Sequence, residues 1–365
     1  MHICHITSVH PRYDIRIFIK ECKSLSSEHK VSLIVADSLG DEINDNITIY
    51  DTGKVAGGRL KRMYYSAKRI FARVLQLNPD VVHFHDPELI NIGVKLVRLG
   101  YKVVYDVHED VPKQILNKHW IPGFLRPLIS KLVMHKEAKS SRIFAGIICA
   151  TEIIANRFRQ YNANTIAIHN YPILAELGMV ESTWEEKSNH LCYLGSISET
   201  RGVLPLVNSL AVSNLILDLA GPFSNSEIEN KVKSSTGYSN VNYLGILSRG
   251  DVKALLGKVK IGVVTLLPTP SYVESLPIKM FEYMLAGIPV LASDFELWRP
   301  IICGNDCGML VNPEDSQQIA EACAKLLNDD TWARTLGENG RRAVLEKYNW
   351  EQEQLRLLAF YQIFN

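Results

Sequence analysis

The sequence contains no apolar run long enough to cross a membrane. The longest such run, Ile143–Ala150, is far shorter than the roughly 20 residues that a transmembrane helix needs. The first residues also lack the basic start and apolar segment of a secretory signal. We therefore exclude a transmembrane anchor and expect a cytoplasmic protein, while attachment to a membrane surface stays open.

Paired cysteines and recognisable metal-ligand sets are also lacking. The cysteines number seven, and only Cys303 and Cys307 lie close together, so the sequence indicates neither a disulfide framework nor a zinc site built from cysteines. His83 and His85 alternate onto one face of an apolar strand, as metal ligands can. No third ligand is evident in the sequence, so we expect no metal and no cofactor.

The net charge of the whole chain is close to zero, but its charged residues are distributed unevenly. The chain carries a net charge of +1, whereas residues 1–170 contain 24 Lys and Arg against 16 Asp and Glu. This basic half suggests anionic partners such as phosphates or an acidic membrane surface. Its most basic stretch, Gly53–Leu77, interleaves aromatic residues with cations, which suits a membrane surface at least as well as a nucleic acid. The alternative is that this stretch is a helix whose basic face is simply solvated and binds no partner.

The sequence does contain a repeated alternation of short apolar strands and amphipathic helices, which predicts an α/β fold. A chain of 365 residues is long enough for two doubly wound, Rossmann-like domains. A polar break at Asn170–Pro172 separates the two series. We place the first domain at residues 1–172 and the second at residues 173–349. The expected strands of the first domain are His2–Ser8, Val31–Ala36, Val81–His85, Val103–Val107, Ile147–Ala150 and Thr165–His169.

The most informative segment is Ser271–Ser293, which we interpret as a loop, a helix and a strand. Pro277 suits the first helical position, and Gly287 ends the helix. A helix start offers unpaired N–H groups and a partial positive charge, which suits a phosphate. Glu274 in the loop and Glu282 on the second helical turn frame this start and could accept hydrogen bonds from ribose or sugar hydroxyls. The alternative is that Glu282 is a solvated helix residue paired with Lys279 and that Glu274 only caps the helix.

Together with the flanking ES-LP and FEYM-AGIPV sequences, this E-x7-E spacing resembles the donor-binding motif of the retaining, family-4-type glycosyltransferases of the GT-B fold. The resemblance covers nearly the whole chain and is most specific in the second half. It implies two Rossmann-like domains facing across a cleft, and a terminal helix, residues 350–365, that crosses back to the first domain. It also implies metal-independent transfer from a nucleoside diphosphate sugar, since the chain has no Asp-x-Asp motif.

Applied residue by residue, the resemblance assigns donor contacts in the second half. Relatives place an Arg and a Lys in the loop after the first strand of this domain, where this chain has Ser196 and Arg201. Arg is the better fork for phosphate. Lys279 and a cation of the first domain are the two candidates for the missing second charge. The resemblance implies catalytic roles for Glu274, His108 and Arg201. The implied donor-binding residues are Glu282, Ser275, Leu276, Pro277, Lys279, Gly195, Ser196, Gly221 and Ile246.

The first half departs from the family at one point. Relatives carry a Gly-Gly turn after the first strand, whereas this chain has His10, Arg12 and Arg16 there. The arginines could replace backbone phosphate contacts by side-chain contacts, or they could be solvated residues at a helix start. His85 and Asp86 stand at the end of a strand, where ligands bind to α/β sheets. We place these five residues on the acceptor side.

The resulting interpretation is a glycosyltransferase of cell-surface polysaccharide biosynthesis, with a glycan or lipid-linked saccharide as acceptor. A nucleotide-sugar epimerase of the same fold and a catalytically silent nucleotide-binding subunit are the alternatives. Trp120–Ile129 adds apolar residues beside cations in the basic half. We therefore expect the protein to attach peripherally to the anionic inner face of the plasma membrane, and we expect no nucleic-acid partner.

Overall fold

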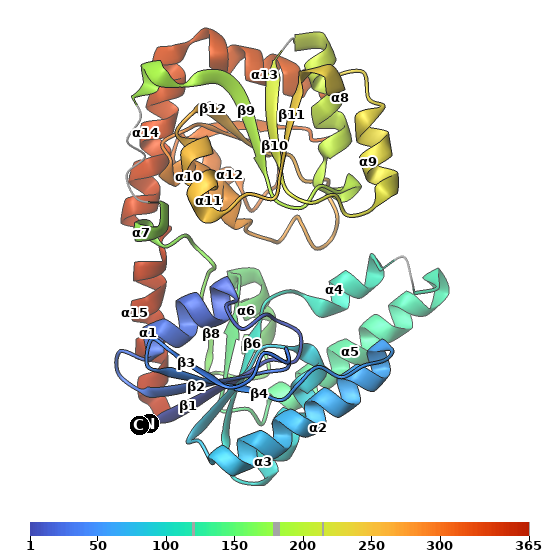
Figure 1. The fold of residues 1–365 in the computed structure, drawn as a ribbon, viewed down its shortest axis with the longest axis vertical. Coiled ribbons are helices and arrows are strands. Elements are labelled where there is room, and N and C mark those ends of the chain that lie inside the picture. Colours follow the sequence, from blue (N-terminus) through green and yellow to red (C-terminus); the bar gives the residue numbers. More distant parts are fainter. Residues whose placement is uncertain (119–120, 178–182, 214, 365) are drawn as a thin grey trace. The chain divides into compact units, whose positions relative to one another are not determined.

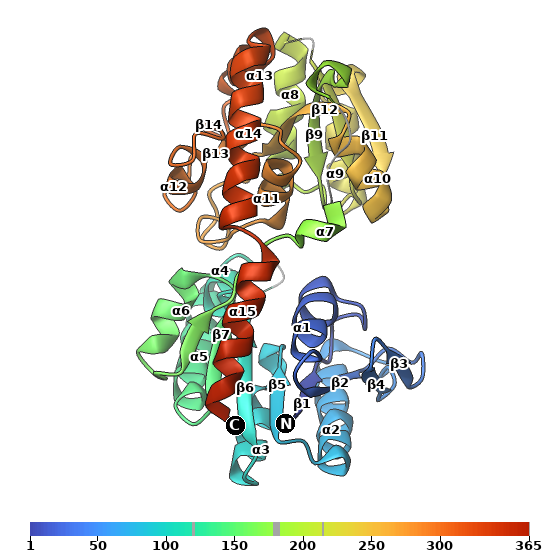
Figure 2. The ribbon, with the colours of Figure 1, turned by 90° about the vertical axis from the view of Figure 1, so that its left-hand side faces the viewer.

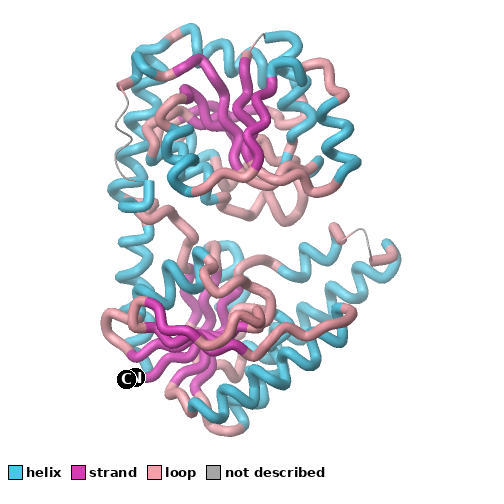
Figure 3. The backbone as a smooth tube through the Cα atoms, viewed as in Figure 1, coloured by secondary structure: helices cyan, strands magenta, loops and turns pink. Residues whose placement is uncertain are grey.

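The computed structural model describes residues 1–365 apart from 119–120, 178–182, 214 and 365. The chain divides into two compact units, residues 1–170 with 352–365, and residues 171–351 (Figure 1). Each unit has a sheet at its centre and helices around it, as Figure 3 shows by colour. The observed divisions lie two residues from the sequence-based boundaries at 172 and 350.

The sheet of the first unit has eight strands in the order β3-β4-β2-β1-β5-β6-β7-β8. Neighbouring strands pair parallel except β3 and β4, which form an antiparallel hairpin at the edge. The sequence does not predict this hairpin, because β3 is only three residues long, is polar at both ends and has no buried residue. The strands are β1 His2–Ile6, β2 Lys30–Val35, β3 Glu42–Asn44, β4 Ile47–Asp51, β5 Val81–Phe84, β6 Lys102–Val107, β7 Gly146–Cys149 and β8 Thr165–Ala167.

The helix after β1 is not a regular α-helix. Its main part, η1 Ile15–Cys22, is a π-helix that continues into the short α1 Lys23–Leu25. Asp14 caps it by accepting hydrogen bonds from the backbone N–H groups of Arg16 and Ile17. The other helices of this unit are α2 Arg59–Leu77, α3 Ile90–Arg98, α4 Val111–Leu116, α5 Arg126–Ser141 and α6 Glu152–Arg159.

The last helix, α15 Trp350–Tyr361, crosses the sheet of the first unit (Figure 2). The Tyr361 hydroxyl lies 2.7 Å from His83 Nδ1, and Lys102 Nζ donates to the Phe364 carbonyl over 2.6 Å. Gly146 allows this approach, because a Cβ there would lie 2.4 Å from the Phe360 ring. The structure thus confirms that the terminal helix returns to the first domain.

The second unit has a six-stranded, wholly parallel sheet in the order β11-β10-β9-β12-β13-β14. The order reverses between β9 and β12, as in other doubly wound folds. The strands are β9 Ser188–Leu194, β10 Ile216–Ala220, β11 Val241–Gly245, β12 Val259–Val264, β13 Val290–Ser293 and β14 Gly308–Val311. The longer helices are α8 Val203–Ser213, α9 Ser226–Lys233, α10 Arg249–Leu256, α11 Ile278–Leu285, α13 Ser316–Asn328 and α14 Asp330–Glu346.

Both faces of the central strands of this sheet are buried, because these strands direct alternate side chains into two cores. Leu191 and Tyr193 of β9 pack with α8, α9 and α13 on one face. Cys192 and Leu194 pack with α10, α11 and α14 on the other. Figure 1 shows α8 and α9 on the opposite side of the sheet from α10 and α11.

The shorter elements of the two units are α7 Leu174–Leu177, α12 Arg299–Ile302 and the 3-10 turns η2 Pro87–Leu89, η3 Gly123–Leu125, η4 Trp184–Glu186, η5 Glu199–Arg201, η6 Tyr238–Asn240 and η7 Gln362–Phe364.

The structure bears on two sequence-based expectations, the lack of a disulfide framework and the lack of a transmembrane helix. All seven cysteines are free, with Cys303 exposed and the others buried. Among the helices that the structure describes, none has the length and hydropathy needed to pass through a bilayer.

Gly262 of β12 provides a test of this packing. A Cβ at this position would lie 2.2 Å from the ring of Tyr283 on α11, so we expect Gly262→Ala to destabilise the protein by about 1–3 kcal/mol through overpacking. Gly250 on α10 is the matched control, because its nearest neighbour would be 3.8 Å away and alanine favours a helix by about 0.5–1 kcal/mol. Urea denaturation measures both, and equal midpoints for the two variants would contradict this account.

Candidate functional site

The central strands of the second sheet end at the same edge. β9 ends at Leu194 and is followed by Gly195 and Ser196, while β12 ends at Val264 and leads through a loop to α11. These strands are neighbours at the point where the strand order reverses. Ligands of doubly wound sheets bind beyond the carboxyl ends of the strands at this switch point. The candidate donor residues therefore gather at the expected edge.

Glycines bring the loops at this edge into close contact. A Cβ on Gly202 would lie 1.7 Å from the Thr265 carbonyl oxygen, and one on Gly221 would lie 2.0 Å from that of Gly195. Gly195, Gly202 and Gly221 all have positive φ angles of 70–139°, which glycine adopts without steric cost. Ile246 follows β11 at the same edge and is 79% exposed. The segments that follow β9, β10 and β11 therefore lie side by side at this edge.

Two cations converge on the switch point. An Arg201 Nη1 atom would lie 3.5 Å from a Cβ on Gly195, so the guanidinium stands beside the turn after β9. Lys279 of α11 is buried, with Nζ 3.8 Å from the centre of the Tyr193 ring. Its Nζ forms no hydrogen bond with any residue that the structure describes. Burial, and secondly the Arg201 charge, lower the pKa of Lys279 to about 7.

The start of α11 differs slightly from the predicted one. Pro277 is the N-cap and not the first helical residue, and its extended backbone leads into Ile278. Ser275 is anchored in the preceding loop, because Trp298 Nε1 donates to its carbonyl oxygen over 2.8 Å. Leu276 packs against the core of the unit, and Glu274 is half-buried on this loop.

Glu282 is buried on α11 and already has a basic partner. Arg249 Nη1 donates to Glu282 Oε1 over 2.8 Å, and Arg249 Nη2 donates to Glu176 over 3.0 Å. The alternative that Glu282 is a solvated residue paired with Lys279 is therefore wrong. Arg249 was missed by the sequence analysis, since it lies far from Glu282 in the chain and opens α10 within a Ser248–Asp251 capping box. It holds the Glu282 carboxylate in place.

The first unit gathers a second polar group at the corresponding edge of its sheet. His10 Nδ1 lies 3.0 Å from Asp86 Oδ1, and the rings of His10 and His108 are 5.1 Å apart. His108 Nε2 lies 2.8 Å from Asp106 Oδ2, and 3.2 Å from His85 Nδ1. Burial alone would lower the pKa of His10, but the hydrogen bond and charge of Asp86 outweigh it and raise that pKa.

Arg12 and Arg16 do not take the place expected for them. Arg12 is buried and bonded to Asp37, Glu42 and the Gly40 carbonyl. Arg16 is buried in a two-point pair with Asp106 and also donates to the Ile168 carbonyl. Both guanidinium groups therefore support the scaffold of the first unit. They are neither solvated nor available as substitutes for a backbone phosphate site.

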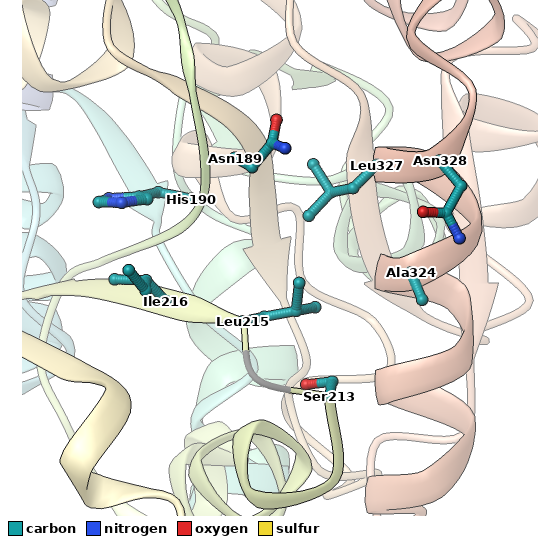
Figure 4. Close-up of a pocket in the computed structure, with 8 residues that line it drawn as sticks. All are labelled: Asn189, His190, Ser213, Leu215, Ile216, Ala324, Leu327 and Asn328. Atoms are coloured by element: carbon teal, nitrogen blue, oxygen red, sulfur yellow. The ribbon is translucent and has the colours of Figure 1, made fainter.

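A pocket elsewhere in the second unit is separate from the candidate donor residues. It is lined by Asn189 and His190 at the beginning of β9, by Leu215 and Ile216 at the beginning of β10, and by residues of α8 and α13 (Figure 4). The amino ends of parallel strands are the edge opposite to the switch-point crevice. We therefore assign the candidate site to the carboxyl edge.

Comparison with protein families accounts for most of the chain. Residues 19–170 match the model of Glycosyltransferase Family 4, and residues 178–343 match that of Glycosyl transferases group 1. The chain is 21% identical over 299 residues to an MMP alpha-(1->4)-mannosyltransferase of Mycolicibacterium hassiacum, covering 78% of this chain and 70% of that protein. It is 22% identical to the O-antigen chain mannosyltransferase C of Escherichia coli, covering 74% and 71%.

Solved structures share the fold. The glycosyltransferase WaaG of lipopolysaccharide biosynthesis superposes with a TM-score of 0.73 at 16% identity, covering 98% of this chain and 99% of that one. Anabaena Alr3699/HepE in complex with UDP-glucose gives a TM-score of 0.76 at 14% identity, covering 99% of both chains. With the two family models matched in order along both units, the chain belongs to the family-4 glycosyltransferases of the GT-B fold, and its activity is the transfer of a sugar.

Proposed function

We propose that the chain transfers a sugar, with retention of configuration, from a nucleoside diphosphate sugar to a hydroxyl of a glycan or lipid-linked acceptor in surface polysaccharide biosynthesis. The observation that carries the donor assignment is the pair of cations at the switch point of the second unit. Among the described residues neither Arg201 nor Lys279 forms an ion pair, although Lys279 is buried. Two adjacent cations of this kind call for an anionic ligand.

The donor diphosphate is the anion that fits these groups. Arg201 offers a planar fork to phosphate oxygens, Lys279 offers a second charge, and the start of α11 adds backbone N–H groups. In the reaction the bond from the anomeric carbon to the diphosphate breaks, and a bond to the acceptor oxygen forms on the same face. The acceptor proton passes to the leaving phosphate. The cations stabilise the charge that develops there, so the proposal needs no metal.

The remaining residues position the donor. Glu282 would accept hydrogen bonds from the ribose hydroxyls while Arg249 fixes its carboxylate. Glu274, on the loop before α11, would contact the transferred sugar. Support for this substrate class comes from the structural neighbour Alr3699/HepE, which holds UDP-glucose. Support for the biosynthetic role comes from relatives named as O-antigen chain mannosyltransferases of Escherichia coli and a capsular polysaccharide biosynthesis glycosyltransferase of Staphylococcus aureus.

A thermal-shift screen against UDP-, GDP- and dTDP-sugars tests the proposed donor class. One donor should raise the melting temperature of the wild-type protein by mass action, and the products formed with an acceptor distinguish transfer from epimerisation. Glu282→Ala should weaken binding of that donor by about 1–3 kcal/mol through loss of a buried acceptor. Glu176→Gln, which changes only the outer partner of Arg249, is the control. Wild-type donor affinity in Glu282→Ala would contradict the assigned ribose contact.

Lys279 predicts a pH dependence of donor binding. In the free protein its pKa is lowered to about 7, so the ammonium is lost as the pH rises through neutrality. A bound diphosphate favours the ammonium and raises this pKa. Affinity for the nucleotide sugar should therefore be constant below about pH 7 and fall by up to about tenfold per pH unit above it.

Calorimetry in EDTA between pH 6 and pH 9 measures this dependence, because the diphosphate of a nucleotide sugar does not itself titrate there. Lys279→Met should bind weakly at every pH and lose the slope. Lys325→Met is the matched control, since Lys325 also lies over an aromatic ring, that of Trp332. Donor binding by Lys279→Met at wild-type strength, or binding that requires magnesium, would overturn the two-cation site.

We also propose that the first unit docks on an anionic membrane surface. Phe124 is 82% exposed, and Leu128 and Leu132 of α5 are 55% and 62% exposed beside the exposed Lys131. The predicted apolar set needs correction, because Ile121 is buried and Trp120 lies outside the described residues. Aromatic and basic side chains settle together in the headgroup layer, and each cation near an anionic surface adds about 1 kcal/mol.

Liposome sedimentation measures this attachment. Binding should require anionic lipid and decrease with added salt. Phe124→Ser with Leu132→Ser should reduce it, as should Lys61→Glu with Lys68→Glu on α2. Arg62 and Arg69 are left unchanged, since they bond to Glu88 and to the Thr52 and Gly53 carbonyls. Val212→Ser on α8 of the second unit, where Val212 is 63% exposed, is the control. Equal binding to neutral and anionic vesicles would contradict the proposal.

A further inference from the structure

The core of the first unit contains three histidines and a glutamate that the donor chemistry does not use. His5 of β1 and His83 of β5 are directly paired in the parallel register, and His85 follows β5. Glu21 lies on the π-helix η1. His5, Glu21 and His83 are completely buried, and His85 is 1% exposed. One potential ligand atom from each of the four residues lies within 4.8 Å of the others.

Hydrogen bonds fix the direction of the histidine lone pairs. Asp106, a carboxylate held by Arg16 at 2.8 Å and 3.0 Å, lies 3.1 Å from His85 Nδ1, so that nitrogen carries the proton. His85 Nε2 is then the acceptor in its 2.9 Å contact with His5 Nδ1. His5 must donate from Nδ1, so its Nε2 carries the free lone pair.

Several buried atoms of this cluster have no hydrogen-bond partner among the described residues. His5 Nε2, His83 Nε2 and both carboxylate oxygens of Glu21 form no hydrogen bond with any residue described. Arg16 Nε lies 3.1 Å from Glu21 Oε1 as an ion pair, which leaves Oε2 turned to His83. Burying polar atoms without hydrogen-bond partners lowers the stability of the folded protein. Such an arrangement in a core calls for a missing partner.

We propose that His5 Nε2, His83 Nε2 and Glu21 bind a divalent transition-metal ion, with zinc as the expected species. Glu21 Oε2 and His83 Nε2 are 3.9 Å apart, too far for a hydrogen bond. Two ligands bound to one ion at about 2.0–2.2 Å each can span this separation. Neutral imidazoles with a carboxylate suit zinc and related divalent ions.

The surrounding contacts fit this assignment. A metal-bound histidine usually donates its other ring N–H to a neighbour, which fixes the ring. His5 does so to His85, and His83 Nδ1 lies 2.7 Å from the Tyr361 hydroxyl. The π-helix that carries Glu21 is a rare element that often marks functional sites. The ion would join β1, β5 and η1, and through Tyr361 it would secure the terminal helix.

Metal analysis of the whole protein tests this site. Protein expressed with zinc and dialysed against EDTA in the native state should retain about one zinc per chain, because the site is completely buried. Unfolding in guanidinium with chelator should release it. Refolding with zinc should then give a melting temperature on the order of 5 °C or more above that of protein refolded without metal. Refolding with cobalt should give the visible absorption of cobalt bound to nitrogen and oxygen ligands.

Glu21→Gln separates a metal site from a hydrogen-bonded cluster. The amide keeps the shape and adds a donor for His83, so a network held by a proton on Glu21 would persist. A metal site would lose a ligand, and the variant should have no bound zinc and no zinc-dependent shift. Glu137→Gln, another completely buried carboxylate of this unit, is the control and should retain the ion. Wild-type protein without metal after refolding in zinc, or equal zinc in Glu21→Gln, would overturn the proposal.

Discussion

Parallel strand pairing decides where chemistry can occur in this protein. Because neighbouring parallel strands run in the same direction, they all end at one edge of the sheet, and the polar residues that follow them must gather there. In the second unit this brings Gly195, Gly221 and Ile246 into one row. In the first unit the ends of β1, β5 and β6 bring together His10, Asp86 and His108. The loops differ, but the constraint that assembles them is the same.

The charged side chains of this protein differ in how far neighbouring groups of opposite charge neutralise them. Arg16 and Asp106 form a buried pair whose desolvation is offset by several bonds, and Arg249 has two carboxylate partners. A buried pair of this kind mainly holds a shape, since removing either partner would leave an unpaired charge. Lys279 is different, because only weak attractions offset the free-energy cost of burying its ammonium group. The stability lost on burying it can be recovered when an anion binds.

Much of the fold and part of the site could be predicted from the sequence, because the decisive signals were local. The strand–helix–strand pattern around Pro277 indicated a phosphate-type helix start, and the alternation of elements indicated two doubly wound units. The role of Arg249 could not be predicted, since its contact with Glu282 depends on how α10 packs beside α11. The histidine cluster could not be predicted from the sequence either. The sequence placed His83 and His85 on one strand, but His5 and Glu21 join them only through the β1–β5 register and a π-helix.

The misassigned arginines show why local sequence could not go further. Arg12 and Arg16 stand where relatives place glycines, so side-chain contacts with phosphate were a reasonable expectation. In the folded unit, however, the edge hairpin β3–β4 supplies Glu42 to Arg12, and the strand β6 supplies Asp106 to Arg16. Neither partner can be paired with its arginine from sequence spacing alone. A cation becomes a candidate for ligand binding only after the fold shows that no carboxylate neutralises it. By this criterion Lys279 and Arg201 qualify, whereas the arginines of the first turn belong to the scaffold.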